Sequence, residues 1–277
     1  MAFPERIDDR AARPVFVGGD GLIAQAYPCL CYNPVCTESA SLMNTPETVI
    51  VDSLLLGRTR PFGPSGELSG IDKQALDAPV SLSASGLAGD EQGDTRYHGG
   101  SEKALHHYAA EHYGWWRDEL PEVAPSCWKA GAFGENLSTT GLTEENVCVG
   151  DIFRLGTARI QVSQARQPCW KLNLRFACKN MAERVQAARR TGWYYRVLEG
   201  GEIAPGARLS LLERPCPDWP LARLLHYFYR DMLDQDALRA LAALETLSPS
   251  WRTLAEQRLL TGKIEDWQRR LNTPEKS

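Results

Sequence analysis

The stretch ENVCVGDIFRLGTARIQVSQARQPCWKLN, residues 145–173, indicates the fold most directly. Apolar and polar residues alternate on both sides of Leu155-Gly156-Thr157, which is the pattern of two strands joined by a tight turn. Strand-like runs with turn residues recur at 48–57, 79–85 and 193–215. Short strands in this number, separated by turns, predict a β-barrel.

Two helices are expected within this β-rich region, at about 101–119 and about 178–190. In the second, Cys178, Met181 and Val185 fall on one face. The region is therefore predicted to be a mainly β domain with interspersed α-helices.

The sequence changes character after Pro215, where three short amphipathic helices follow one another. Asp234 and Ser248-Pro249 are typical helix starts, and Gly262 is a typical helix stop. The apolar residues at helical spacing are expected to form a core. We therefore predict the β domain over 47–215 and a three-helix module over 216–271.

Residues 1–46 differ from the rest, because they are rich in Pro, Gly, Asn and Ser. Gly19, Gly21 and Ala24 formally match a dinucleotide-binding fingerprint, but prolines soon after them break the helix that such a fingerprint opens. The cysteine-rich run CLCYNPVC, residues 29–36, has no fourth ligand nearby for a metal. We expect a poorly ordered extension.

Length and composition exclude several classes of protein. The chain has 277 residues, 43% hydrophobic and 24% charged, as in globular proteins. A net charge of −4 without a basic tract argues against a nucleic-acid polymer as partner. No apolar run approaches the roughly 18 residues that span a bilayer, and no secretory signal is indicated. Eight cysteines are too few for a disulfide scaffold, so we expect a cytoplasmic protein with reduced thiols.

Cys169 differs from the other cysteines in its neighbours. It ends a strand-like run, follows Pro168, and lies between Arg166 and Lys171. Positive neighbours favour the thiolate, which is the nucleophilic and metal-binding form of cysteine. Cys169 is therefore the candidate reactive thiol.

A glycine-rich stretch, GLAGDEQGDTRYHGGSEKALHHY, covers residues 86–108. Its clustered glycines require a sharply bent backbone that lies close to another group. Gly99-Gly100 precede the helix expected at 101–119, and Lys103 lies near its start, so this pair could hold an anion. A plain turn with a helix cap explains the pattern equally well. His98, next to the pair, is a candidate proton donor, although loop histidines are more often structural.

Other polar residues are assigned to packing. On the expected helix, His107 and His112 are five positions apart and cannot share a metal; they and His106 are expected to be surface or packing residues. In the loop GAFGENLSTTG, residues 131–141, Glu135 and Asn136 could bind a polar ligand or fix the turn. The second interpretation is favoured.

Three motifs together resemble the MOSC-domain proteins, and among them the YiiM-like branch. They are GDEQGDTRYHGG (89–100), FGENLSTTGLTEENVCVGDIF (133–153) and IQVSQARQPCWKLN (160–173). The tail SWRTLAEQRLLTGKIEDWQRRL, residues 250–271, is similar to the C-terminal three-helix module of that branch. The resemblance covers about 48–271 and implies a MOSC-type β-barrel that holds a molybdenum cofactor.

The resemblance also implies roles for particular residues. The single cysteine ligand of the family maps onto Cys169, a soft donor suited to molybdenum. The implied cofactor-binding residues are His98, Gly99, Gly100, Lys103, Asn136, Arg166 and Lys171. Further residues that could line the pocket are Tyr97, Glu135 and Asn173.

The activity implied by the resemblance is reduction of N-hydroxylated bases such as 6-N-hydroxylaminopurine. The reaction is a two-electron cleavage of an N–O bond, with His98 as a possible proton donor. The chain shows no flavin or nicotinamide motif, so the implied electron donor is a separate flavoprotein reductase.

Two alternatives remain open from the sequence. The first is a non-catalytic molybdenum-cofactor carrier or sulfur-transfer module, as some MOSC domains serve sulfur transfer. The second is a thiol hydrolase, because Cys169, His98 and Asn136 are the residue types of a Cys-His-Asn triad.

Overall fold

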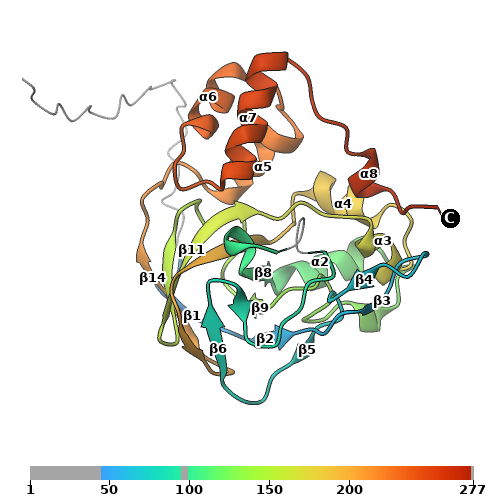
Figure 1. Cartoon of the computed structure of the whole chain (residues 1–277), viewed down its shortest axis with the longest axis vertical. Coiled ribbons are helices and arrows are strands. Elements are labelled where there is room, and N and C mark those ends of the chain that lie inside the picture. The colour runs from blue at the N-terminus through green and yellow to red at the C-terminus, as the bar shows by residue number, and fades with distance from the viewer. Residues whose placement is uncertain (1–44, 95–98, 276–277) are drawn as a thin grey trace, which may run out of the picture. The chain divides into compact units, whose positions relative to one another are not determined.

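The computed structural model describes residues 45–94 and 99–275. Its largest element is a nine-stranded sheet in which all neighbours are antiparallel except the parallel pair β8 and β9 (Figure 1). In order across the sheet, the strands are β1 (Thr48–Ile50), β14 (Arg208–Glu213), β10 (Ile152–Leu155), β11 (Ala158–Ala165), β12 (Trp193–Glu199), β8 (Leu105–Ala109), β9 (Leu137–Thr139), β2 (Ser53–Leu56) and β5 (Gln74–Ala75). The smaller sheets contain β13 (Gly201–Ile203), β6 (Val80–Ser83) and β7 (Gly86–Leu87), and then β3 (Arg60–Pro61) and β4 (Leu68–Ser69).

Helices lie between the strands and after them. Within the sheet region they are the 3₁₀ turns η1 (Ser101–Lys103) and η2 (Pro125–Cys127), and the α-helices α2 (Glu111–Glu119), α3 (Lys171–Arg175) and α4 (Met181–Ala188). The C-terminal helices are α5 (Leu221–Tyr229), α6 (Gln235–Ala242), α7 (Pro249–Thr261) and α8 (Gln268–Leu271). The predicted mainly β region with interspersed helices and a C-terminal helical module is confirmed.

The large sheet of the predicted β-barrel is not closed, because the strand pairings in the described residues leave β1 and β5 as edges. The sheet must nevertheless curl. β1 and β2 lie near opposite ends of the strand order, yet only Val51 and Asp52 separate them, a span of roughly 7 Å. The N–H of Val51 bonds to Ala207 O beside β14, and the N–H of Asp52 bonds to Ser138 O in β9. The single strand expected at 48–57 is therefore two strands, β1 and β2, which lie near opposite ends of the strand order.

The local signals for turns and helix ends were read correctly. Gly156 joins β10 to β11 with φ of 58°, and a Cβ there would lie 2.3 Å from Glu202 O. The Asp234 side chain accepts a 2.7 Å hydrogen bond from the N–H of Ala237 and so caps α6. Pro249 begins α7, and Gly262 ends it in the left-handed conformation.

The helix expected at 101–119 is wrong in its first half. Only Ser101–Lys103 is helical there, as a single 3₁₀ turn, and Leu105–Ala109 is strand β8. All five residues of β8 are buried between β12 and β9, so pairing with distant strands overrides the local pattern. The second half of the prediction is confirmed, because Glu111–Glu119 forms helix α2.

Two hydrophobic cores hold these elements together. The larger one contains sheet residues such as Phe153 and Tyr195 together with Leu224, Phe228 and Trp251 from the C-terminal helices. The sheet and the three-helix module therefore share one core, and the boundary expected at 215/216 stays a prediction. The smaller core is aromatic, with Trp116, Trp128, Phe133 and Phe176 packed under the loops that carry the site described below.

His107 in β8 faces the larger core and should make stability depend on pH. It is fully buried between Tyr195 Oη and Thr139 Oγ1, each 2.9 Å from a ring nitrogen, and burial lowers its pKa to about 3. Between pH 6.5 and about 3 the unfolded chain binds a proton that the folded chain does not, so acidification destabilises the fold by up to roughly 1.4 kcal/mol per pH unit.

Urea unfolding of wild type and His107→Gln at pH 7, 6, 5 and 4 checks this expectation. Buried His106, whose pKa is also lowered, adds to the wild-type slope, so the difference between the two proteins isolates His107. The variant should be less stable at pH 7 and should lose less stability on acidification. Equal slopes in both proteins would show that His107 is not held neutral by the fold.

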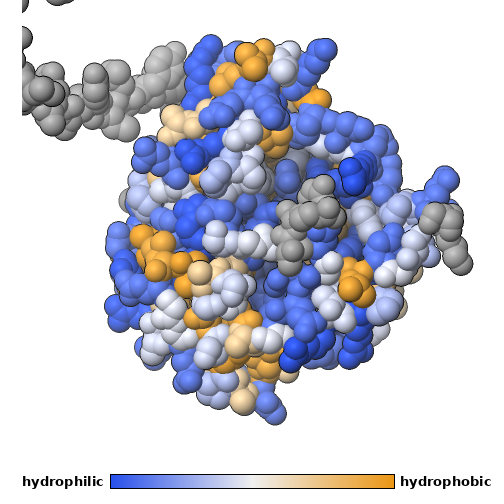
Figure 2. All heavy atoms as spheres, viewed as in Figure 1, coloured by the Kyte–Doolittle hydropathy of each residue, from blue (hydrophilic) through white to orange (hydrophobic). Residues whose placement is uncertain are grey.

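The surface is mixed in polarity. On the face in Figure 2, hydrophobic residues occur in small groups among hydrophilic ones, a common arrangement on proteins. Among the described helices, none has both the length and the apolar character needed to cross a bilayer.

Candidate functional site

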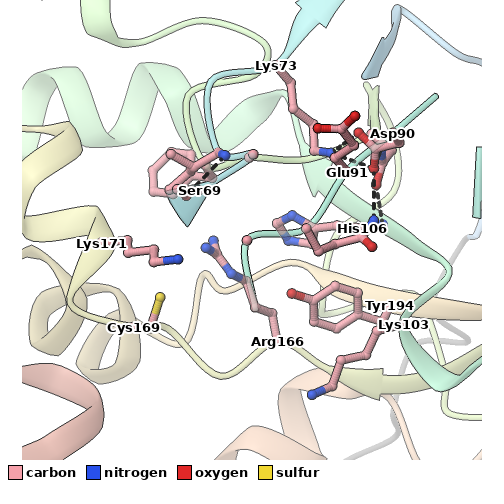
Figure 3. A pocket seen from close by; sticks show the side chains of 17 residues that line it. Ser69, Lys73, Asp90, Glu91, Lys103, His106, Arg166, Cys169, Lys171 and Tyr194 are labelled. Atoms are coloured by element: carbon pink, nitrogen blue, oxygen red, sulfur yellow. Dashed lines mark hydrogen bonds and ion pairs between the residues drawn. The ribbon is translucent and has the colours of Figure 1, made fainter. Parts of the chain in front are cut away.

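A pocket lies where the loops of the sheet region meet (Figure 3). Its lining comes from segments far apart in sequence: the loop after β4, residues 90–93, Lys103 at the end of η1, β8, residues 133–136, and the chain from Arg166 to Lys171. Close backbone contacts bring two of these segments together. A Cβ at Gly93 would lie 1.9 Å from Leu68 O, and one at Gly70 would lie 2.0 Å from Glu91 O. The close approach predicted from the glycine-rich stretch is therefore confirmed.

Cys169 lies in the loop between β11 and α3 and is 7% exposed. The loop begins where the N–H of Arg166 bonds to Gly192 O, and it ends where the N–H of Leu172 bonds to Cys169 O. In Figure 3 the sulfur of Cys169 lies alongside the side chains of Arg166 and Lys171. The structure thus places the predicted thiol and its two predicted cations in one pocket.

The buried guanidinium of Arg166 is the clearest indication that the pocket binds a hydrogen-bond acceptor. Arg166 is 6% exposed, and its Nη1 has no hydrogen-bond partner among the residues that the structure describes. A buried donor without a partner costs about 1–3 kcal/mol, which an acceptor bound in the pocket would recover.

Lys171 and Lys103 add positive charge to the same pocket. Lys171 is buried and donates a 2.7 Å hydrogen bond from Nζ to Leu68 O. Lys103 lines the pocket, and burial lowers its pKa. Counting Lys73 as well, the described lining contains four cations and two carboxylates, Asp90 and Glu91. An anionic ligand is therefore favoured over a cationic one.

Lys73 and Asp90 form an ion pair on another wall of the pocket. Lys73 Nζ lies 2.5 and 2.7 Å from the two carboxylate oxygens of Asp90, and both side chains are nearly inaccessible. The carboxylate also accepts hydrogen bonds from the N–H of Gly57 and from Asn136 Nδ2. Burial lowers the pKa of Lys73, against the opposing effect of Asp90.

Asn136 lines the pocket as predicted, but its amide is already committed. Oδ1 accepts a 3.0 Å hydrogen bond from the N–H of His106, and Nδ2 donates to Asp90 Oδ2 and to Leu55 O. Asn136 therefore fixes the positions of β8 and Asp90. Its direct contact with a cofactor stays a prediction.

His106 is a pocket residue that the sequence did not reveal. The assumed helix at 101–119 hid the alternation of β8, in which His106 lines the pocket while His107 faces the core. Burial, followed by the charges of Arg166 and Lys73, holds the pKa of His106 well below its usual value. His106 is therefore a neutral imidazole near neutral pH. Lys73, Asp90 and Tyr194 also line the pocket and are not among the predicted site residues, although Asp90 lies within the motif at 89–100.

Two predicted pocket residues have structural roles outside the lining. The Glu135 carboxylate accepts hydrogen bonds from Tyr113 Oη and from the N–H groups of Gly131 and Phe133, and burial raises its pKa. The Asn173 amide in α3 donates a hydrogen bond to Leu271 O in α8 and accepts one from the N–H of Ala182 in α4. Their prediction as lining residues is not supported by the pocket.

The remaining predicted residues lie around the gap in the description. His98 and Tyr97 lie outside the described residues, so their roles stay predictions. Gly99 and Gly100 precede the single 3₁₀ turn η1, and the helix whose N-terminus they were expected to form is absent. Neither glycine belongs to the described lining, and their contact with a cofactor stays a prediction.

The chain is similar to proteins whose relationship covers both the sheet and the helices. Residues 94–210 match the family model "MOSC domain", and residues 219–262 match "YiiM-like, 3-alpha helix domain". Protein YiiM from Escherichia coli (strain K12) is 44% identical over 208 residues, which are 75% of this chain and 92% of that protein. A protein of Gibberella moniliformis named "Reductase" is 44% identical over 177 residues; these are 63% of this chain and 31% of the fungal protein.

The likeness extends to three dimensions. A crystal structure of YiiM from Escherichia coli superposes with a TM-score of 0.69 at 38% sequence identity, covering 82% of this chain and 99% of that one. The two family-model matches include the Cys169 loop and most of the three-helix module.

Proposed function

This chain belongs to the MOSC-domain family, in its YiiM-like branch, and we propose that it is a molybdenum-cofactor-dependent reductase of N-hydroxylated bases. The proposed reaction converts a hydroxylamino group of the 6-N-hydroxylaminopurine type into an amino group and water. The observation that carries the proposal is the buried thiol of Cys169 beside Arg166, whose Nη1 has no partner in the described residues. The name of the fungal relative, "Reductase", supports the reaction class.

The side chains of the pocket fit the group that the family implies. Cys169 would ligate molybdenum through sulfur, a soft donor suited to it. Arg166, Lys171 and Lys103 would bind the phosphate and the other anionic parts of the pterin, with Arg166 able to make a bidentate contact. When bound, the cofactor supplies the two-electron reduction, and the protein supplies binding and orientation.

The reaction consumes two electrons and two protons for each N–O bond cleaved. Neutral His106 can orient a substrate by hydrogen bonding, but its low pKa makes it a poor proton store. Burial lowers the pKa of the Lys103 ammonium, but its proposed contact with the anionic pterin opposes proton donation. His98 is the proposed donor. The electrons would come from a separate flavoprotein reductase.

The contacts of Asn136 with the described residues do not support the hydrolase alternative. In a Cys-His-Asn triad the amide orients the ring of the histidine base. Here the Asn136 side chain bonds to Asp90, Leu55 O and the backbone of His106. No observation favours the hydrolase, and the carrier alternative becomes an outcome of the test.

The test is metal analysis and turnover of protein purified from cells that make the cofactor. We expect near-stoichiometric molybdenum and conversion of 6-N-hydroxylaminopurine to adenine when a chemical reductant supplies electrons. Molybdenum without turnover would support the carrier. Protein without molybdenum from such cells, active as a thiol hydrolase, would overturn the proposal.

Arg166→Ala should reduce cofactor retention more than it reduces stability. Removing the guanidinium takes away a charged contact to an anion, and charge-assisted hydrogen bonds contribute about 1.5–3 kcal/mol, so molybdenum binding should weaken by roughly 10- to 150-fold. The cofactor-free variant should unfold at nearly the wild-type urea concentration, because an unpartnered buried donor is also removed. Arg175→Ala, which breaks a partly exposed pair with Asp72, is the matched control and should keep its cofactor. Equal occupancy in Arg166→Ala and wild type would remove Arg166 from the site.

A further inference from the structure

The C-terminal end of the described chain contacts the loop that carries Cys169. Arg270, in α8, makes two hydrogen bonds to this loop from different parts of the residue. Its Nη1 donates a 2.6 Å hydrogen bond to Pro168 O, and its own carbonyl accepts a 2.8 Å hydrogen bond from the N–H of Trp170. The residues before and after Cys169 are thus both bonded to one arginine.

The same helix is tied to the two helices that follow the loop. Arg270 Nη2 donates a 2.6 Å hydrogen bond to Gln186 Oε1 in α4. Asn173 in α3 donates from Nδ2 to Leu271 O at 2.8 Å, and its Oδ1 accepts from the N–H of Ala182 at 2.8 Å. Figure 1 shows α8 next to α3 and α4, away from the other C-terminal helices.

The three-helix module anchors this segment. Trp267 immediately precedes α8, and its ring packs edge-on against Tyr229 of α5, with centroids 5.9 Å apart. Its Nε1 donates to Glu265, whose carboxylate pairs with the buried Arg258 of α7. A chain of contacts therefore runs from the core of the module to Arg270.

The Cys169 loop is held in part by these contacts, because they pair the peptide groups on both sides of Cys169. Proline at 168 has no N–H to donate. Within the described residues, Arg270 is the hydrogen-bond partner of both the carbonyl of Pro168 and the N–H of Trp170. Without α8, the carbonyl of Pro168 and the N–H of Trp170 would form hydrogen bonds with water instead, and the loop could take other conformations.

We propose that residues 267–273 form a C-terminal clamp that fixes the Cys169 loop, with Arg270 as its positioning residue. The inference rests on the proposed function only in that it gives Cys169 the metal-binding role. The three-helix module holds the clamp in place through the contacts of Trp267 and Glu265. Arg270 touches the backbone of the loop and acts through it.

The first experiment measures the alkylation rate of each cysteine in cofactor-free protein with iodoacetamide, read by peptide mass spectrometry. Arg270→Ala should raise the rate at Cys169 by about tenfold or more, since two hydrogen bonds that hold its loop are weakened or lost. The rates at Cys127 and Cys178, which are free and partly buried, should not change. Arg269→Ala, an exposed neighbour on the same helix, is the matched control. An unchanged rate at Cys169 in Arg270→Ala would overturn the clamp.

Two further variants separate positioning from general loss of structure. Arg270→Lys can still donate to Pro168 O but cannot also reach Gln186 in the same geometry, so its Cys169 rate should be intermediate. Gln186→Ala removes only the second bond and should also give an intermediate rate. If Arg270→Ala raised the rates at all cysteines together, Arg270 would be a global stabiliser and the clamp would be wrong.

A second experiment distinguishes failure of the clamp from failure of the proposed function. Molybdenum loss during dialysis should be about tenfold faster from Arg270→Ala than from wild type and Arg269→Ala. If wild type holds no molybdenum, the proposed function fails, while the alkylation rates still decide on the clamp. If wild type holds molybdenum and Arg270→Ala matches it in retention and alkylation, only the clamp fails.

Discussion

Cys169→Ala should give a folded protein with no molybdenum and no reductase activity. The thiol is the ligand that the protein itself would contribute to the metal, and alanine has no donor atom to replace it. The substitution removes one sulfur atom from a nearly buried position, so we expect a change in unfolding free energy of about 1 kcal/mol or less. Metal analysis, turnover and urea unfolding on the same preparation measure the three quantities.

Cys178→Ala is the matched control for this prediction. Cys178 is a partly buried free thiol in the loop before α4, where its sulfur lies 3.5 Å from Asn180 Oδ1. The variant should keep wild-type molybdenum content and activity. If Cys169→Ala also kept its molybdenum, the ligand assignment would be wrong and the cations alone would hold the cofactor.

Asp90→Asn should have the largest effect on stability. The Asp90 carboxylate is 2% exposed and pairs with Lys73, which is 6% exposed, so the substitution leaves a buried ammonium without its counter-charge. Breaking a buried pair in this way costs about 3–5 kcal/mol, which corresponds to a fall in Tm of roughly 6–20 °C for a chain of this size class. Calorimetry of the cofactor-free protein measures the shift.

A second substitution tests the cause. In Asp90→Asn/Lys73→Met both charges are absent, and replacing a buried pair by neutral groups is often close to neutral, so most of the lost stability should return. In the single variant, loss of Asp90 should move the pKa of Lys73 further below the ordinary 10.5, because Asp90 opposes the effect of burial. Between this lowered pKa and 10.5, the unfolded chain binds more protons than the folded chain. Stability should therefore rise with pH in this range. A double variant as unstable as Asp90→Asn would show that the carboxylate matters through Gly57 and Asn136 instead.

The features that the sequence predicts well are those that depend on neighbouring residues. The turn at Gly156, the cap at Asp234 and the helix stop at Gly262 all follow from local backbone chemistry. Cys169, Arg166 and Lys171 were found for the same reason, because six consecutive positions contain all three. The glycine-rich stretch predicts close backbone contact but not the partner, which is β4 together with Gly70 directly after it.

The features that the sequence does not predict depend on pairing between distant segments. β8 was taken for a helix because its burial comes from β9 and β12, and this error hid His106. Lys73 and Asp90 are 17 positions apart and meet only in the fold, and their charged neighbours Asp72 and Glu91 do not mark them as part of a site. Asn173 was predicted as a lining residue on resemblance, whereas its amide bonds to α4 and to Leu271 near the C-terminus. No local pattern contains that information.

The contact between α8 and the Cys169 loop also sets an order of events during synthesis. Arg270 is translated 102 positions after Pro168, to which its side chain bonds. On the ribosome, the segment around the thiol therefore emerges and meets solvent well before its last hydrogen-bond partners exist. The nascent chain can complete this loop only once the residues of the final helix have left the exit tunnel.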